Sequence, residues 1–600
     1  MSGMQKVSRL AAIAPVATIA LVLAGPALAQ QAALQQAAPA RMAYLPTEPV
    51  QPAYAPAQGA PLGEADGAED LGGAEGQDGP STSDAAHPKQ GRSARRFTIR
   101  PYIEAMQVFD ADVAGDHEVD TYTTLAAGAD GQLNGRNTKA AFSVRYEHRI
   151  GEHNAGDGDG VSGMLRGRSR LGTDGLHLDY GAMAQRMHLD AGGAATADTG
   201  IAAADTQLYS AFIGPSFAGK LGALRFEDHY HYGYTAVSGG TAGVGGAGGT
   251  DVLSHAQVHD LGGSLGNRPG EGLPVGLSVE GGYHEEDVSN LGQRFTDAYG
   301  QGRLTVPVAP HLALTGALGY EHVEVSAHDA LYDASGNVLY DSAGRLETDW
   351  SSPRHIAFDT SGLTWDAGLI WRPSRRTSLE AHVGRRYGAL GGYGSFSYQP
   401  DPRNSFNLVV YNEVGSSGGA MVSGLVGTST DFSAIRDAIS GALVGCAASV
   451  QGTACIAGAS GSLSSAIGRR RGVLANWGIN FGRVQAGIGA GYDRREYLTG
   501  SGTVLGSLNG EVDQYEWVAA YIADRLSARA SVQGTVDLYH YETGLAGSGN
   551  VSAIRVSGVY QYMLTRHLTA SAALAINGMS REALDDLWAT SGALAMRYNF

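Results

Sequence analysis

From Phe97 to the last residue, the chain consists of segments of about 9–14 residues in which apolar and polar side chains alternate, with turn signals between the segments. The last segment is the clearest, because one of its two faces carries the large side chains of Trp588, Leu594, Met596, Tyr598 and Phe600 together with the smaller Thr590 and Gly592. A period of two is the repeat of a β-strand that has one apolar and one polar face. The pattern therefore predicts an all-β fold over residues 97–600.

Composition narrows the kind of β-protein. Charged residues make up only 17% of the chain, mean hydropathy is -0.14, and tyrosine (28) outnumbers phenylalanine (13) and tryptophan (6). A helical membrane protein would be more apolar, and no stretch after residue 29 has the ~18 continuous apolar residues that a spanning helix needs. The intermediate hydropathy favours a sheet with one face towards lipid and the other towards water.

The connections between segments fall into two classes that alternate along the chain. Strict alternation of short turns with long loops is typical of a transmembrane β-barrel, with the short turns in the periplasm. We expect one large antiparallel barrel of about 22 strands, with 18 or 20 still open. A soluble β-sandwich or solenoid would also alternate in polarity, but it would not sort its turns by length. Short, often basic turns lie near 134–138, 308–312, 372–378, 400–405, 481–484, 525–529 and 564–568, and Gly- and Asp-rich loops at 151–160, 190–205, 238–252, 329–361, 414–468 and 498–511.

Residues 1–29 have the organisation of a secretory signal peptide. Lys6 and Arg9 precede an apolar core, and small residues lead to an expected cleavage between Ala29 and Gln30. An uncleaved anchor helix is the alternative. The mature chain is thus expected to leave the cytoplasm and to become a multi-pass barrel in an outer membrane.

Residues 30–96 are rich in Ala, Pro and Gln and then in Gly, Asp and Glu. Such a segment cannot bury a core, so we expect a disordered periplasmic extension. It could touch a periplasmic partner, although a solvated tether is the simpler interpretation.

Cys446 and Cys455 are the two cysteines of the chain. In an oxidising compartment this close pair predicts a disulfide. The surrounding loop, residues 414–468, contains Ile435, Ile439 and Leu443 at helical spacing. A helix here could fold into the barrel as a constriction, or the loop could stand outside, and the sequence does not decide between the two.

The polar faces of the strands carry charges of both signs. These charges could orient hydrated solutes in the lumen, or they could form cross-strand ion pairs that hold the wall together. Two histidines on one face could bind a metal, but solvated histidines are the simpler interpretation, so no metal site and no cofactor is predicted. The candidate lumen-facing residues are Arg145, Glu147, Arg149, Glu227, His229, His231, Glu280, His284, Asp366, Glu380 and Arg386.

Some charges break the alternation. Asp228, Arg186 and Arg385 fall on apolar faces, where a charge is costly in mid-membrane. A bulge or an error in the assumed register could explain them.

The final segment, which ends in MRYNF, resembles the C-terminal strand of Gram-negative outer-membrane barrels. The resemblance implies that Tyr598 and Phe600 form a signal read by the barrel-assembly machinery. More narrowly, the chain resembles poorly characterised porin-like barrels of alphaproteobacteria. A 22-strand barrel is also similar to TonB-dependent transporters, but those carry a folded plug much longer than residues 30–96.

The remaining functional classes are limited by charge and by motifs. The net charge of -17 and the dispersed basic residues exclude a nucleic-acid partner. No HExxH motif, Walker loop or clustered CxxC occurs, so we expect no enzyme. The expected partners are outer-membrane lipid and lipopolysaccharide. The expected function is a passive channel for small hydrophilic solutes. The alternatives are an export conduit, for example for polysaccharide, and a non-conducting surface barrel whose loops bind ligands.

Overall fold

The computed structural model describes residues 96–114, 119–153, 155–172, 175–189, 195–197, 206–239, 251–401, 403–449, 452–455, 461–544, 549–582 and 585–600. These residues belong to one compact unit. The predicted signal peptide with its Ala29–Gln30 cleavage point lies outside the described residues, and so does the predicted extension up to residue 95.

One antiparallel sheet of 22 strands closes into a ring, which confirms the predicted fold class and strand number. Each strand pairs with its neighbours in the chain, and β1 pairs with β28 to close the ring, from Tyr102 opposite Asn599 to Ala114 opposite Trp588. Around the ring the strands are β1 (Arg96–Ala114), β2 (Val119–Asn134), β3 (Thr138–His153), β4 (Gly158–Arg170), β5 (Leu176–Leu189), β7 (Thr206–Leu221), β8 (Leu224–Ser238), β9 (His255–Asn267), β10 (Gly276–Val288), β11 (Gln293–Ala309), β12 (Leu312–Ala327), β15 (His355–Ser374), β16 (Thr377–Arg386), β17 (Ala389–Asp401), β18 (Asn404–Gly415), β22 (Gly468–Asn480), β23 (Val484–Tyr497), β24 (Val512–Asp524), β25 (Ala530–Glu542), β26 (Val551–Met563), β27 (Leu568–Arg581) and β28 (Leu587–Asn599).

The remaining elements are short and belong to loops. They are β6 (Ala195–Ala197), which extends the edge of β5, the pair β13 (Asp329–Ala330) and β14 (Thr348–Asp349), the small sheet of β19 (Ser433–Arg436), β20 (Leu443–Ser449) and β21 (Gly452–Cys455), the helix α2 (Ser417–Val426), and the 3-10 turns η2 (Asn290–Gly292) and η3 (Gly506–Leu508). No helix within the described ranges is long and apolar enough to cross a membrane.

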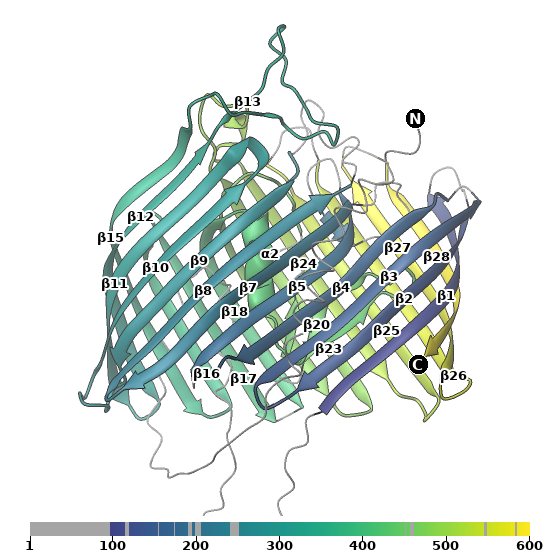
Figure 1. Ribbon diagram of the computed structural model, residues 1–600, viewed down its shortest axis with the longest axis horizontal. Coiled ribbons are helices and arrows are strands. Elements are labelled where there is room, and N and C mark those ends of the chain that lie inside the picture. Colours follow the sequence, from purple (N-terminus) through teal and green to yellow (C-terminus); the bar gives the residue numbers. More distant parts are fainter. Residues whose placement is uncertain are drawn as a thin grey trace, which may run out of the picture. The chain divides into compact units, whose positions relative to one another are not determined.

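The strands cross the barrel obliquely, and α2 lies behind the strands of the near wall in Figure 1. Every short turn predicted from the sequence joins two consecutive strands at one rim, as between β24 and β25 or between β26 and β27. The first strand starts and the last strand ends at this same rim, which we call the periplasmic rim. The longer loops join the strands at the opposite, extracellular rim.

The outer surface of the ring is apolar. In β28 the side chains of Leu594 and Met596 are exposed, whereas the alternate Ala593 and Ala595 are buried. Large aromatic side chains are exposed on the outside close to the periplasmic turns, as expected for a membrane–water interface. They include Trp371, Tyr398, Trp477, Tyr562 and Phe600.

A closed ring leaves no sheet edge, and its apolar exterior matches lipid, so the chain spans an outer membrane as a multi-pass β-barrel. The alternation that the sequence displays is thus the alternation between hydrocarbon and lumen.

The apolar exterior can be tested at Leu594, which lies mid-strand with 63% of its side chain exposed. Leu594→Arg places a charge in hydrocarbon, and we expect it to lower the free energy of unfolding in lipid vesicles by about 2–4 kcal/mol. Urea titrations read by gel mobility measure the loss. As a control, Leu526→Arg in the exposed turn after β24 should cost less than about 1 kcal/mol. Equal losses at both positions would contradict the assigned exterior.

Candidate functional site: the inserted loop and the inner wall

The long connection between β18 and β22, residues 416–467, folds into the barrel, and we call it the inserted loop. Its helix α2 packs against β7, β8 and β9. Further along, β19 packs against β3, and β21 packs against β18, β22 and β23. Of the two interpretations that the sequence left open, the structure has the loop on the inside.

The helix of this loop was predicted at the wrong place. Ile435, Ile439 and Leu443 do not share a helix face but lie in three separate apolar clusters, with Tyr521, with Val108, and with the residues around α2, respectively. A turn interrupts the predicted helix, because the carboxylate of Asp437 accepts hydrogen bonds from the N–H groups of Ile439 and Ser440.

The observed helix α2 comes earlier, within SGGAMVSGLV. The Ser416 hydroxyl caps it by accepting a hydrogen bond from the N–H of Gly419 at 3.0 Å. Three glycines in ten residues lower the intrinsic helix propensity, so packing must supply the stability. Met421 and Leu425 are fully buried.

The close approach of α2 to the wall depends on glycine. A Cβ at Gly233 of β8 would lie 2.5 Å from Val422 Cγ1, and one at Gly418 would lie 2.5 Å from Ala256 Cβ. The helix therefore sits directly on the inner surface of β8 and β9. The apolar cluster around it includes Leu253 and Leu463 from neighbouring loop segments, so the extracellular end of the lumen is packed with apolar side chains.

Arg436 fixes the middle of the inserted loop to one part of the wall. Its guanidinium donates hydrogen bonds to the hydroxyls of Ser162 on β4 (2.6 Å) and Ser143 on β3 (3.0 Å), and to the carbonyl of Gly441 in its own loop (2.9 Å). Its backbone carbonyl accepts a hydrogen bond from Gln533 on β25. The same residue thus connects β3 and β4 with β25.

Asp437 forms an ion pair with Arg555 on β26, in which Nε lies 3.0 Å from a carboxylate oxygen and both side chains are at least 93% buried. Burial acts to raise the pKa of Asp437, but the charge and hydrogen bonds of Arg555, with the two backbone N–H groups, outweigh it and lower that pKa to about 2. The carboxylate is therefore ionised at neutral pH, and the pair is a charged anchor.

The backbone carbonyls of the inserted loop also bind to the wall. Arg166 on β4 donates to the carbonyls of Val426 (3.0 Å), the last residue of α2, and of Thr428 (3.1 Å), which follows the helix. Gln185 on β5 donates to the carbonyl of Leu443. Wall side chains thus supply donors that an irregular segment inside a barrel cannot find in a sheet.

Asp251 ties the extracellular loops together. Its carboxylate accepts hydrogen bonds from Asn290 Nδ2 (2.9 Å), Ser465 Oγ (2.7 Å) and the N–H of Leu346 (3.1 Å). Burial nevertheless raises the pKa of Asp251. Four loop segments, distant in sequence, therefore meet at one carboxylate at the mouth of the barrel.

Many of the predicted polar-face residues lie in compact ionic clusters on the inner wall. The Arg303 guanidinium contacts Glu280 (3.0 Å) and Asp366 (3.0 Å), and His382 contacts both Asp366 (3.0 Å) and Glu380 (3.1 Å). All of these side chains are buried except that of Glu380, which is half-buried. The cluster joins β10, β11, β15 and β16.

A second cluster joins β11, β12 and β16. Arg386 contacts Asp297 at 2.9 Å and Glu321 at 3.2 Å, and its guanidinium lies 4.7 Å from the Tyr299 ring centroid. The N–H of Tyr387 donates to Glu321.

Arg145 forms a third cluster, with Glu104 at 2.8 Å and Glu147 at 3.1 Å. Arg186 also reaches Glu147, at 2.7 Å, although its position in β5 assigns it to the apolar face. The pairing between β4 and β5 stops at Gly163 opposite Ala184. Beyond that point the side chain of Arg186 lies against Gly160, and only 3% of Arg186 is exposed. By contrast, Asp228 is exposed on the outside near the periplasmic turn of β8.

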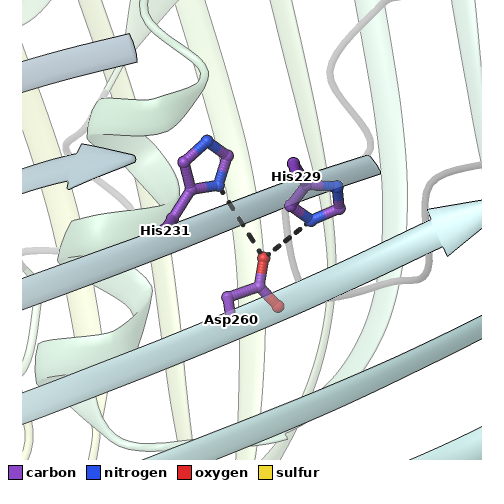
Figure 2. A group of neighbouring side chains, drawn as sticks. All are labelled: His229, His231 and Asp260. Atoms are coloured by element: carbon purple, nitrogen blue, oxygen red, sulfur yellow. Dashed lines mark hydrogen bonds and ion pairs between the residues drawn. The ribbon is translucent and has the colours of Figure 1, made fainter. Parts of the chain in front are cut away.

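A fourth cluster, on β8, β9 and β10, consists of three histidines and two carboxylates. His229 Nε2 and His231 Nδ1 lie 3.1 and 3.9 Å from the same oxygen of Asp260, as Figure 2 shows. His284 Nδ1 lies 3.3 Å from the other oxygen of Asp260, and its Nε2 lies 3.0 Å from Glu286. We call these five residues the histidine cluster.

Two of the predicted polar-face residues lie outside these clusters. Arg149 is half-buried, with its guanidinium 4.4 Å from the Tyr122 ring centroid, and Glu227 is half-buried on β8 beside the periplasmic rim.

Sequence reasoning missed the partners that complete these sites, namely Asp260, Asp297, Arg303, Arg436, Asp437 and Arg555. Asp260 could have been found, because it stands at the alternate position to exposed Leu261, opposite His231 in the register.

The strand register shows where the two cysteines lie. Cys446 and Cys455 stand directly opposite each other in the β20–β21 hairpin. The described part of the structure does not extend to these side chains, so the disulfide stays a prediction.

At the other end of the chain, Tyr598 is exposed in β28, with its ring against those of His567 and Phe600. The N–H of Phe600 donates to the carbonyl of Pro101. Their role as an assembly signal stays a prediction.

No protein-family model and no curated protein matches the sequence. The barrel is similar to solved structures that include the FrpB iron transporter from Neisseria meningitidis (F5-1 variant), at 12% identity over 84% of this chain and 82% of that chain, with a TM-score of 0.39. The siderophore receptor PiuA from Acinetobacter baumannii is 10% identical over 83% of this chain and 82% of that chain, with a TM-score of 0.35. The ferric-catecholate import receptor Fiu from E. coli K12, in its open form, is 10% identical over 85% of this chain and 82% of that chain, with a TM-score of 0.37. Identities and scores this low assign the chain to no family and no function.

Proposed function

We propose that the protein is an outer-membrane channel for passive diffusion of small hydrophilic solutes, and that the inserted loop sets the width of the path. The observation that carries the proposal is the placement of this loop inside the barrel, anchored by Arg436 and Asp437. A surface loop that bound ligands outside the cell would not need buried anchors on the inner wall.

The charged side chains of the inner wall favour hydrophilic solutes. The clusters on this wall place cations and anions in direct contact, at 3.0 Å between Arg303 and Asp366 and at 3.0 Å between Arg470 and Asp493. Such pairs hold the wall and also present fixed dipoles to water and to hydrated solutes. A passive channel needs no energy input, no cofactor and no catalytic group.

We propose the same partners that the sequence suggests. The apolar exterior would contact outer-membrane lipid and lipopolysaccharide, and Tyr598 and Phe600 would be read by the barrel-assembly machinery. Residues 30–96 would be available to a periplasmic partner.

Removing the obstruction should widen the path. We expect deletion of residues 420–460 to raise single-channel conductance in planar bilayers, because it removes most of α2 and both charged anchors. The matched control removes residues 334–336 from an exposed extracellular turn, where Asp333 and Asn337 form a local hydrogen-bonded turn. The control should conduct like the unmodified protein, and heat-modifiable gel mobility verifies that each barrel is folded. Unchanged conductance after the 420–460 deletion, or no open state at any voltage, would refute the proposal.

The ionic anchor can be broken on its own. Asp437→Ala leaves Arg555 buried without its carboxylate, which typically costs about 3–5 kcal/mol. We expect the detached state of the loop to become at least about a hundredfold more populated, since each 1.4 kcal/mol is a factor of ten, and limited proteolysis within the loop to accelerate accordingly. Asp431→Ala is the control, because Asp431 bonds to Ser429 of its own loop segment. Equal protease resistance in the two variants would show that the ion pair does not hold the loop.

The same anchor has a defined pH window. The pKa of Asp437 is lowered from 3.8 to about 2, so its stabilising contribution is complete above the ordinary value and is lost as the pH falls towards 2. Conductance should therefore be insensitive to this anchor between pH 5 and 8, and the loop should loosen only below about pH 4. Recordings of the unmodified protein and of Asp437→Asn at each pH isolate the effect, which should vanish in the variant. An anchor-dependent transition near neutral pH would contradict this assignment.

A further inference from the structure

The histidine cluster differs from the other ionic clusters of the inner wall. The clusters around Arg145, Arg303 and Arg386 each place an arginine between two carboxylates. Arg470 likewise lies between Glu413 (3.6 Å) and Asp493 (3.0 Å). None of the five members of the histidine cluster is an arginine or a lysine. Its two carboxylates face three imidazoles, which are the commonest metal ligands in proteins.

Its geometry converges on one point. Asp260 stands opposite His231 of β8 and opposite His284 of β10 in the strand register, and His229 reaches the same carboxylate from two residues away. One ligand atom each from His229, His231 and Asp260 lies within 4.8 Å of the others (Figure 2). An ion about 2.1 Å from each ligand needs them about 3–3.5 Å apart, so rotations that move the rings by about one ångström suffice.

The backbone leaves room for both rings. A Cβ at Gly262, directly across from His229, would lie 2.4 Å from His229 Cε1, and one at Gly214 would lie 2.7 Å from His231 Cδ2. Side chains of His229, His231 and Asp260 remain 11–20% exposed, so a further coordination position is open to lumenal water.

Outer partners complete the arrangement. His284 and Glu286 are 3% exposed; His284 contacts the second oxygen of Asp260, and Glu286 contacts the other ring nitrogen of His284. Such carboxylate–histidine chains are the usual support for metal ligands. The other Glu286 oxygen accepts the N–H of Ser416 at 2.7 Å, which connects the site to the start of α2.

We propose that His229, His231 and Asp260 bind one divalent transition-metal ion, such as Zn²⁺ or Cu²⁺, with His284 and Glu286 as positioning residues. Two nitrogen ligands and one oxygen ligand suit these ions and not Ca²⁺ or Mg²⁺, which prefer oxygen. The binding does not depend on whether the barrel conducts.

The test uses the full mature chain without a polyhistidine tag, refolded in detergent, with heat-modifiable gel mobility as the check of folding. Equilibrium dialysis against Zn²⁺ should give one ion per chain. His231→Ala and Asp260→Asn should each weaken binding at least about 100-fold, and His284→Ala about 10–100-fold. The control is His322→Ala. His322 lies 3.8 Å from the carboxylate of Asp359, and both side chains are about half exposed.

A second measurement keeps the test decisive if a variant does not fold. The electron paramagnetic resonance spectrum of the unmodified protein with one equivalent of Cu²⁺ should show coupling to two imidazole nitrogens. Absence of stoichiometric Zn²⁺ binding, binding equally strong in folded His231→Ala, or a Cu²⁺ spectrum without nitrogen coupling would each overturn the proposal.

Discussion

The seam between β1 and β28 is the contact on which the rest of the structure depends. Within hydrocarbon each unpaired backbone N–H or C=O costs several kcal/mol, so a sheet in lipid must close upon itself. Closure is achieved here by pairing of β1 with the last strand from Tyr102 to Ala114, with one shift of register between Asp112 and Ala114. Once the ring is closed, every second side chain must face inwards whatever its chemistry. The lumen is therefore a consequence of the seam, and its charges must be accommodated there.

The inner wall accommodates its charges mainly by pairing them across strands. Arg303, Arg386 and Arg145 each bridge two carboxylates. The inserted loop uses the same means. An irregular segment inside a barrel lacks strand partners for its carbonyls, and Arg166 and Gln185 supply the missing donors. The apolar side of α2 is buried against β8, where Gly233 lets the helix approach. Ionic pairing and close packing thus hold the loop together.

The fold was predictable because the strands alternate between side chains that face hydrocarbon and side chains that face the lumen, and because the longest loops all lie at one rim. The predicted strict alternation of short and long connections was wrong between β16 and β17, since only two residues join these strands at the extracellular rim. Even Arg186, which breaks the alternation, could be recognised as an exception from the sequence. The location of the helix was not predictable from local spacing. Ile435, Ile439 and Leu443 have helical spacing, yet each packs against a different part of the barrel. The glycine-rich α2 has weak propensity and forms because the wall offers it an apolar surface. Ion-pair partners such as Asp437 and Arg555 are 118 residues apart, and only the closed ring brings them together.

Glu286 connects two features that would otherwise be separate. One of its oxygens contacts His284 in the histidine cluster, and the other accepts the N–H of Ser416 at the start of α2. A Cβ at Gly419 would lie 2.0 Å from this carboxylate, so the first turn of the helix rests directly on it. Any displacement of α2 must therefore rearrange Glu286 and, through His284, the orientation of Asp260. Because such coupling is reciprocal in free energy, whatever fixes Asp260 also favours the seated helix. The inserted loop and the histidine cluster are in this sense parts of one site.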